Sequence, residues 1–166
     1  MLETSVIMKH IGTLGGKFVV DAAQDALLEI ANGPPIQDAD PTYNLPDGGG
    51  RTKAGDPKYD EWFSGTSEVL KVYVEKLGDG PFFAGEKPGY AEPLVWHSLD
   101  NCFSIDKPAF TDAIGAEAMG KLTAYYDAFA ALDGIKEYLA KRPIFPASKE
   151  AGAAGVFGLK GSRANP

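Results

Sequence analysis

The sequence has little of what several classes of protein require. Of its 166 residues, one is a cysteine (Cys102) and two are histidines, so it permits no internal disulfide and shows no Cys/His spacing for structural zinc. It contains neither a long apolar run nor a signal-peptide pattern, and we therefore expect a soluble protein without membrane insertion. The single cysteine fits the cytoplasm or another reducing compartment, an organelle stroma included.

An excess of positive charge is also lacking. Lys and Arg number 16 against 23 Asp and Glu, which gives a formal net charge of −7. Because nucleic-acid binding requires a basic stripe or patch, and none is visible, we expect no nucleic-acid partner. What the sequence does contain is 44% hydrophobic residues, enough for the core of a single domain.

Apolar residues recur at helical spacing along most of the sequence. The segments with this periodicity are 4–11, 17–32, 58–77, 90–103, 116–132 and 135–141. No segment shows the alternation of apolar and polar residues that is typical of a half-buried strand. We therefore predict an all-α protein, a helical bundle. The residues predicted to lie in its core are Trp96, Leu99, Leu122, Phe129 and Leu139.

Glycine and proline predict where these helices are interrupted. Gly12 is expected to stop the first helix, and Gly33 with the following pair of prolines is expected to end the second. Between Gln37 and Pro57 the sequence is rich in breaks and poor in apolar residues, which predicts a surface loop.

Three features that could carry chemistry have simpler interpretations. His97 lies within an apolar helical segment, where a packed or partly exposed histidine is favoured over a catalytic base. Cys102 lies in the same segment without a neighbouring cation to stabilise a thiolate, so a buried apolar role is expected. The glycine run 48–50 does not stand between a strand and a helix, which favours a flexible loop over a phosphate site. Composition and spacing alone therefore assign no chemistry.

Three separated stretches carry a more specific signal. Residues 3–12 read ETSVIMKHIG, residues 82–92 read FFAGEKPGYAE, and residues 122–143 end in YLAKRP. They resemble, in this order, the motif that opens the last helix of the thioredoxin-like domain of glutathione S-transferases, the entry to the central helix of their helical domain, and their closing helices. The order and spacing match over residues 3–143, and we identify the chain as similar to the glutathione S-transferase superfamily.

The resemblance implies a division of the chain and a binding site. Residues 1–16 would be a remnant of the thioredoxin-like domain, residues 17–143 the helical C-terminal domain, and residues 144–166 an irregular tail rich in Ala and Gly. In the family the first motif binds the γ-glutamyl end of glutathione, which implies that Glu3 and Thr4 contact glutathione. The alternative is that Thr4 or Ser5 only caps a helix.

Two functions follow from the resemblance. The first is a glutathione S-transferase-like protein that in full-length form conjugates glutathione to hydrophobic electrophiles. The second is a noncatalytic module that acts as a structural or scaffolding subunit of a larger assembly. The family's cis-proline and thiolate-stabilising residue have no counterpart in the 166 residues, so we predict no catalytic residue and no useful conjugation by this polypeptide alone. We expect a protein partner or a homodimer, with apolar residues near the start (Val6, Ile7, Ile11 and Phe18) left bare for the contact.

The entry to the segment 90–103 also has a local physical interpretation. Gly89 can serve as the N-cap of a helix, and the Glu92 carboxylate can reach back to the backbone N–H of Gly89. This is half of a capping box, because glycine contributes no side-chain acceptor of its own.

Overall fold

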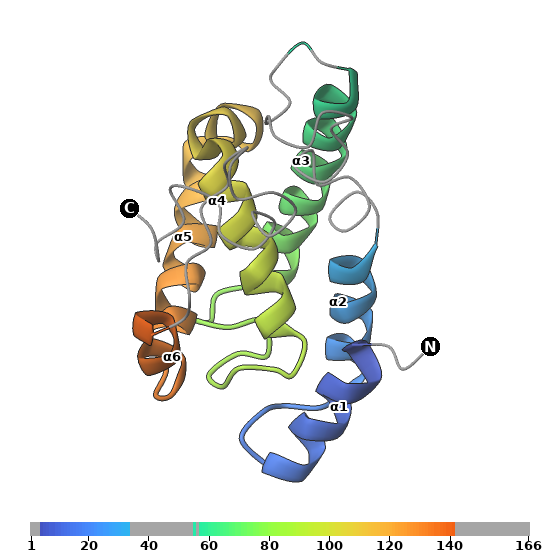
Figure 1. Cartoon of the computed structure of the whole chain (residues 1–166), viewed down its shortest axis with the longest axis vertical. Helices are drawn as coiled ribbons and strands as arrows, with labels where there is room; N and C mark the ends of the chain where they lie inside the picture. Colours follow the sequence, from blue (N-terminus) through green and yellow to red (C-terminus); the bar gives the residue numbers. More distant parts are fainter. Residues whose placement is uncertain (1–3, 34–54, 56, 142–166) are drawn as a thin grey trace.

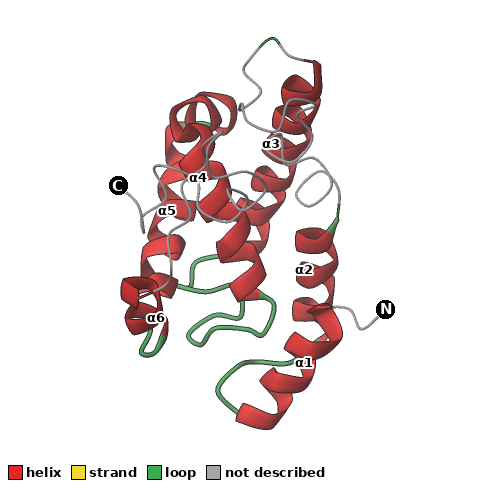
Figure 2. Cartoon of the chain, viewed as in Figure 1, coloured by secondary structure: helices red, strands yellow, loops and turns green. Residues whose placement is uncertain are grey.

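The computed structural model describes residues 4–33, 55 and 57–141. The part of the chain that it describes contains helices and no strand (Figure 2), which confirms the all-α prediction. The helices are α1 (Thr4–Gly15), α2 (Ala22–Asn32), α3 (Pro57–Leu77), α4 (Glu92–Ile114), α5 (Ala116–Ala130) and α6 (Ile135–Lys141). The predicted tail 144–166, the glycine run 48–50 and most of the predicted loop lie outside the described residues.

The second helix starts later than the sequence predicted, at residue 22 rather than 17. Asp21 is its N-cap, and the side chain accepts a hydrogen bond from the Gln24 N–H at 2.9 Å. The backbone just before Asp21 is hydrogen-bonded to another segment. The Val19 N–H donates to the Pro88 carbonyl at 3.0 Å, and the Tyr90 N–H donates to the Val19 carbonyl at 3.1 Å. This pairing with a distant segment prevents residues 17–20 from joining the helix.

The central helix is longer than predicted, because it continues past residue 103 through a kink to Ile114. The backbone leaves the helical conformation at Asp106, whose carboxylate then accepts a hydrogen bond from the Ala109 N–H at 3.0 Å. Asp106 thus caps a second helical stretch in which Pro108 occupies the first turn, where proline is tolerated. The first helix likewise runs past Gly12 to Gly15.

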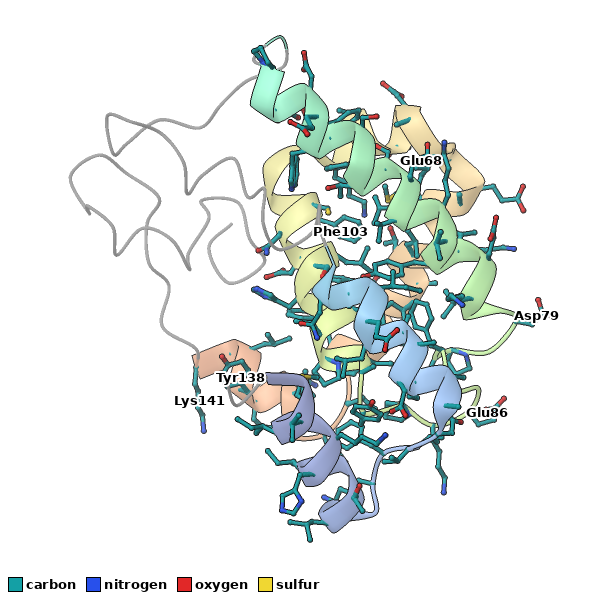
Figure 3. All side chains as sticks on the ribbon, turned by 90° about the vertical axis from the view of Figure 1, so that its right-hand side faces the viewer. Glu68, Asp79, Glu86, Phe103, Tyr138 and Lys141 are labelled. Atoms are coloured by element: carbon teal, nitrogen blue, oxygen red, sulfur yellow. The ribbon has the colours of Figure 1, made fainter. Side chains whose placement is uncertain are left out.

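Helices α3, α4 and α5 pack together, α2 packs against α4, and α6 against α5 (Figure 1). Four of the five predicted core residues, Trp96, Leu99, Leu122 and Phe129, are buried, whereas Leu139 is half-buried and packs against this core. Helix α1 lies beyond the end of α2, at one end of the molecule in both views (Figures 1 and 3). Among the described residues, no helix is long and apolar enough to cross a membrane.

Candidate functional site

The predicted glutathione contacts fall at the very start of the described chain. Thr4 is the first residue of α1, and Glu3 lies outside the described residues. The structure therefore shows the N-terminal end of α1, where the predicted contacts of Glu3 and Thr4 with glutathione would be made. The contacts themselves remain a prediction.

Helix α1 carries a row of exposed apolar side chains. Their exposed fractions are 57% for Val6, 47% for Ile7, 59% for Ile11 and 73% for Leu14. We call these four residues the α1 face. Phe18, which the sequence grouped with them, is half-buried and packs against the core. Such a group of large exposed apolar side chains on one short helix is typical of a surface that contacts another protein.

The opposite side of α1 approaches the domain closely at Gly12. A Cβ atom at this position would lie 2.7 Å from Cβ of Tyr90, closer than two carbon atoms can approach without a shift. Gly12 is itself buried, and Met8, one turn earlier, is half-buried against the core. The glycine therefore allows α1 to lie directly on Tyr90.

A polar cluster joins α1 to two other segments. The Lys9 ammonium on α1 donates to both carboxylate oxygens of Asp25 on α2, at 2.8 and 2.6 Å, and the Tyr90 hydroxyl donates to the same carboxylate. The hydrogen bonds from Lys9 and then Tyr90 hold the pKa of Asp25 below its ordinary value. Burial, followed by the neighbouring Asp25, raises the pKa of Tyr90. At neutral pH Asp25 is therefore a carboxylate and Tyr90 a neutral phenol.

Gln24, the residue next to Asp25, makes a second connection to the start of α4. Its side chain is buried, and Oε1 accepts a hydrogen bond from the Ala91 N–H at 3.2 Å. A Cβ atom at Gly89 would lie 1.9 Å from the Gln24 side chain, so only glycine leaves room for it. The sequence singled out Gly89 as a cap and missed Gln24. The available signal was that Gln24 shares a helix face with Leu27, Leu28 and Ala31.

Glu92 is a fully buried carboxyl group at the first residue of α4. Its Oε1 accepts from the Gly89 N–H at 2.7 Å, as the sequence predicted, and also from the Ala84 N–H at 3.2 Å. The Tyr125 hydroxyl donates to the Glu92 backbone carbonyl at 3.1 Å. Burial raises the pKa of Glu92 to about 7, although both N–H groups favour the charged form. The Glu92 carboxylate therefore connects two positions of the loop before α4, and the backbone carbonyl of Glu92 connects the start of α4 to α5.

The other two side chains that the sequence analysis considered for catalysis, Cys102 and His97, lie in ordinary positions on α4. Cys102 is buried, as expected, and His97 is exposed with its ring 3.5 Å from the Asn101 amide. Asp100, which the sequence did not single out, is buried and accepts a hydrogen bond from the Tyr126 hydroxyl at 2.5 Å. No group of three His, Cys, Asp or Glu side chains among the described residues could hold a metal ion.

Comparison with known families identifies this architecture. A sequence model described as "Glutathione S-transferase, C-terminal domain" matches residues 53–142, more than half of the chain. The chain belongs to the glutathione S-transferase family. Glutathione S-transferase Mu 2 of Mus musculus is 33% identical over 93 residues, which are 53% of this chain and 40% of the mouse protein. The match thus spans about two-fifths of the length of that relative.

The polar contacts described above lie partly inside and partly outside the residues that match the family. Glu92, its N–H donors and Tyr125 all lie within the matched glutathione S-transferase domain, as does Tyr90. Lys9, Asp25 and the α1 face lie before it. The contacts of Glu92 therefore lie within the matched domain, and the α1 face and its ion pair lie before it.

Proposed function

We propose that the chain is the helical part of a glutathione S-transferase-like protein that conjugates glutathione to hydrophobic electrophiles, with a thioredoxin-like half seated on the α1 face. The observation that carries the proposal is the α1 face itself: four large apolar residues, each about half exposed or more, stand on a helix that is anchored to a domain of this family. An apolar surface of this kind is favourable to cover and costly to leave in water.

In this proposal the start of α1 and the helical domain bind different parts of the reacting pair. The start of α1 would bind the γ-glutamyl end of glutathione, with Glu3 facing the α-ammonium, and Thr4 and free helix N–H groups facing the α-carboxylate. The glutathione thiolate would attack the electrophilic carbon, and a carbon–sulfur bond would form as the bond to the leaving group breaks, with the leaving group taking the electron pair, as chloride does from a chloroarene. The apolar side chains of the helical domain would form the wall for the electrophile.

The group that stabilises the thiolate would come from the thioredoxin-like half. The buried hydroxyls of Tyr73 and Tyr125 are unsuited to this role, because burial raises the pKa of both and keeps them from a ligand. Tyr90 is unsuited as well, because its hydroxyl already donates its hydrogen bond to Asp25. We accordingly propose the division made from the sequence, with residues 1–16 belonging to the thioredoxin-like half, 17–143 to the helical domain and 144–166 to a tail.

The test is a conjugation assay with glutathione and an activated chloronitroarene. We expect no useful turnover from the purified chain alone, and turnover when a thioredoxin-like half of a Mu-class relative is added in trans or fused before Met1. In the completed protein, the substitutions Glu3→Ala and Thr4→Val should weaken glutathione binding, whereas Ser5→Ala should not. Turnover by the chain alone, at the rate of the completed protein, would contradict this division.

A binding arm separates the two functions that the sequence left open. Ile7→Asp and Ile11→Asp on the α1 face should abolish association with the added half. Tyr138→Asp on α6, a side chain 61% exposed (Figure 3), is the matched control and should not. Association that depends on the α1 face but yields no turnover would favour the noncatalytic scaffolding module. Self-association of the chain through the same face, measured by sedimentation, would favour a homodimer.

A further inference from the structure

Helix α1 has little apolar contact with the rest of the molecule. Its large apolar side chains point into solvent at four positions, and Met8 is the α1 side chain that packs against the core. Its attachment therefore combines two small apolar contacts, Met8 on the core and Gly12 on Tyr90, with the ion pair between Lys9 and Asp25. This distinguishes α1 from α3, α4 and α5, whose buried side chains are mostly apolar, with the polar exceptions Thr66, Ser67, Glu92, Ser98 and Asp100 on α3 and α4.

The polar attachment converges on one carboxylate. Asp25 accepts from Lys9, which belongs to α1, and from Tyr90, which belongs to the segment before α4. The Lys9 and Asp25 side chains are 47% and 42% exposed, so water and salt reach the ion pair. An ion pair in this setting can open without exposing any buried charge.

The Tyr90 half of the cluster is fixed independently of α1. Tyr90 is buried, its backbone N–H is bonded to Val19, and the following residue is bonded to Gln24. The Asp25–Tyr90 pair therefore stays in place when α1 moves, and Lys9 is the part that can leave. The other charges that act on Tyr90 are Asp21, the N-cap of α2, and Glu29 on α2; both are acids and supply Asp25 with no alternative cation.

We propose that Asp25 is a charge latch: it holds α1 against the helical domain through Lys9, and loss of either charge releases α1 as a unit while α3, α4 and α5 stay folded. Release would change how the α1 face and the start of the helix are presented to a partner. The latch goes beyond the proposed function, since it needs neither glutathione nor a second protein to operate.

The test is amide hydrogen exchange on the full chain, comparing α1 with α5 in the same sample. Asp25→Lys and Lys9→Asp should each accelerate exchange in α1 by about tenfold or more and leave α5 within about twofold of the original chain. The double reversal, Asp25→Lys with Lys9→Asp, should restore slow exchange in α1, because the pair reforms with opposite polarity. Glu29→Lys makes the same type of charge change one turn further along α2 and should leave α1 unchanged.

Two further variants keep the result interpretable if a charge reversal disturbs folding. Asp25→Asn keeps the shape of the side chain, and Tyr90→Phe keeps the ring that lies on Gly12 while removing the hydroxyl. Both should loosen α1 without affecting α5, the first more than the second. The proposal is overturned if the single reversals leave α1 exchange unchanged, if the double reversal is as fast as the singles, or if α1 and α5 accelerate together in all of these variants.

Discussion

The interior between α3, α4 and α5 and the terminal helix α1 are held by different forces. In the interior, aromatic rings interlock: the Trp96 ring stacks on Tyr126 with centroids 4.8 Å apart, and the Trp62 ring meets Phe110 edge-on at 5.5 Å. On α1 the large apolar groups face water, and an exposed ion pair provides the attachment. Most of the stability therefore comes from the interior between α3, α4 and α5. Helix α1 contributes an exposed apolar surface.

The two carboxylates show the same contrast. Glu92 is buried and bonded to backbone N–H groups that cannot move away, and burial raises its pKa to about 7. Asp25 is bonded to the exposed ammonium of Lys9 and to the hydroxyl of the buried Tyr90, and those bonds lower its pKa. Substitutions at Glu92 should therefore change the stability of the whole domain, and substitutions at Asp25 the position of one helix.

The largest difference between the regions should come from one substitution made in each. Leu122 is fully buried on α5, and Leu122→Ala should lower the free energy of unfolding by about 3–5 kcal/mol through lost burial and an unfilled cavity. Leu14, 73% exposed on α1, is the matched control, and Leu14→Ala should change it by less than about 0.5 kcal/mol. Urea unfolding measures both. Similar losses at the two positions would remove the distinction between core and surface.

A smaller effect is expected from pH, acting through Glu92. The pKa of Glu92 is raised from its ordinary value of 4.5 to about 7, so between these pH values the folded state binds more protons than the unfolded chain. Its contribution to stability is fully present below pH 4.5 and is lost as pH rises through about 7, an effect of about 3 kcal/mol.

The control for this pH effect is Glu92→Gln, which keeps an acceptor for the Gly89 and Ala84 N–H groups but does not titrate. Urea unfolding at a series of pH values should show the decline in the original chain and a flatter profile in the variant. A profile that declines equally in both would assign the effect to other groups.

The smallest effect should follow from adding a methyl group beneath α1. Gly12→Ala places a Cβ 2.7 Å from Cβ of Tyr90, so α1 must shift outward. The helical preference of alanine offsets part of the cost, and the net change in unfolding free energy should be about 1 kcal/mol or less. Gly15, where a Cβ meets nothing within 4 Å, is the matched control. Amide exchange should accelerate in α1 for Gly12→Ala alone.

Much of the fold was predictable because local periodicity determines it. The helices 58–77, 116–132 and 135–141 were placed within two residues of their observed bounds, since each carries apolar residues at helical spacing that pack against the core. One error, the start of α2, lies where distant segments meet. Val19 pairs with the segment Pro88–Tyr90 and delays the start of α2, and no pattern within residues 17–32 reports that pairing.

The polar contacts divide in the same way. The bond from Gly89 to Glu92 was predictable from the local motif of a glycine and a carboxylate three positions later, but the prediction of Gly89 as the N-cap was wrong, because α4 begins at Glu92 with Ala91 as its N-cap. The partners of Gln24 and Asp25 were not, because Ala91 and Tyr90 stand more than sixty positions away in the sequence. Glu3 and Thr4 remain predictions from family resemblance.

The most direct measurement of the central claim is amide hydrogen exchange on the unmodified chain. If α1 is held mainly by one exposed ion pair and the interior by buried rings, the amides of α1 should exchange about a hundredfold faster than those of α5, through an opening that does not unfold the core. The contradictory result is exchange of α1 and α5 amides at one common rate, which would mean that both regions open together as a single cooperative unit.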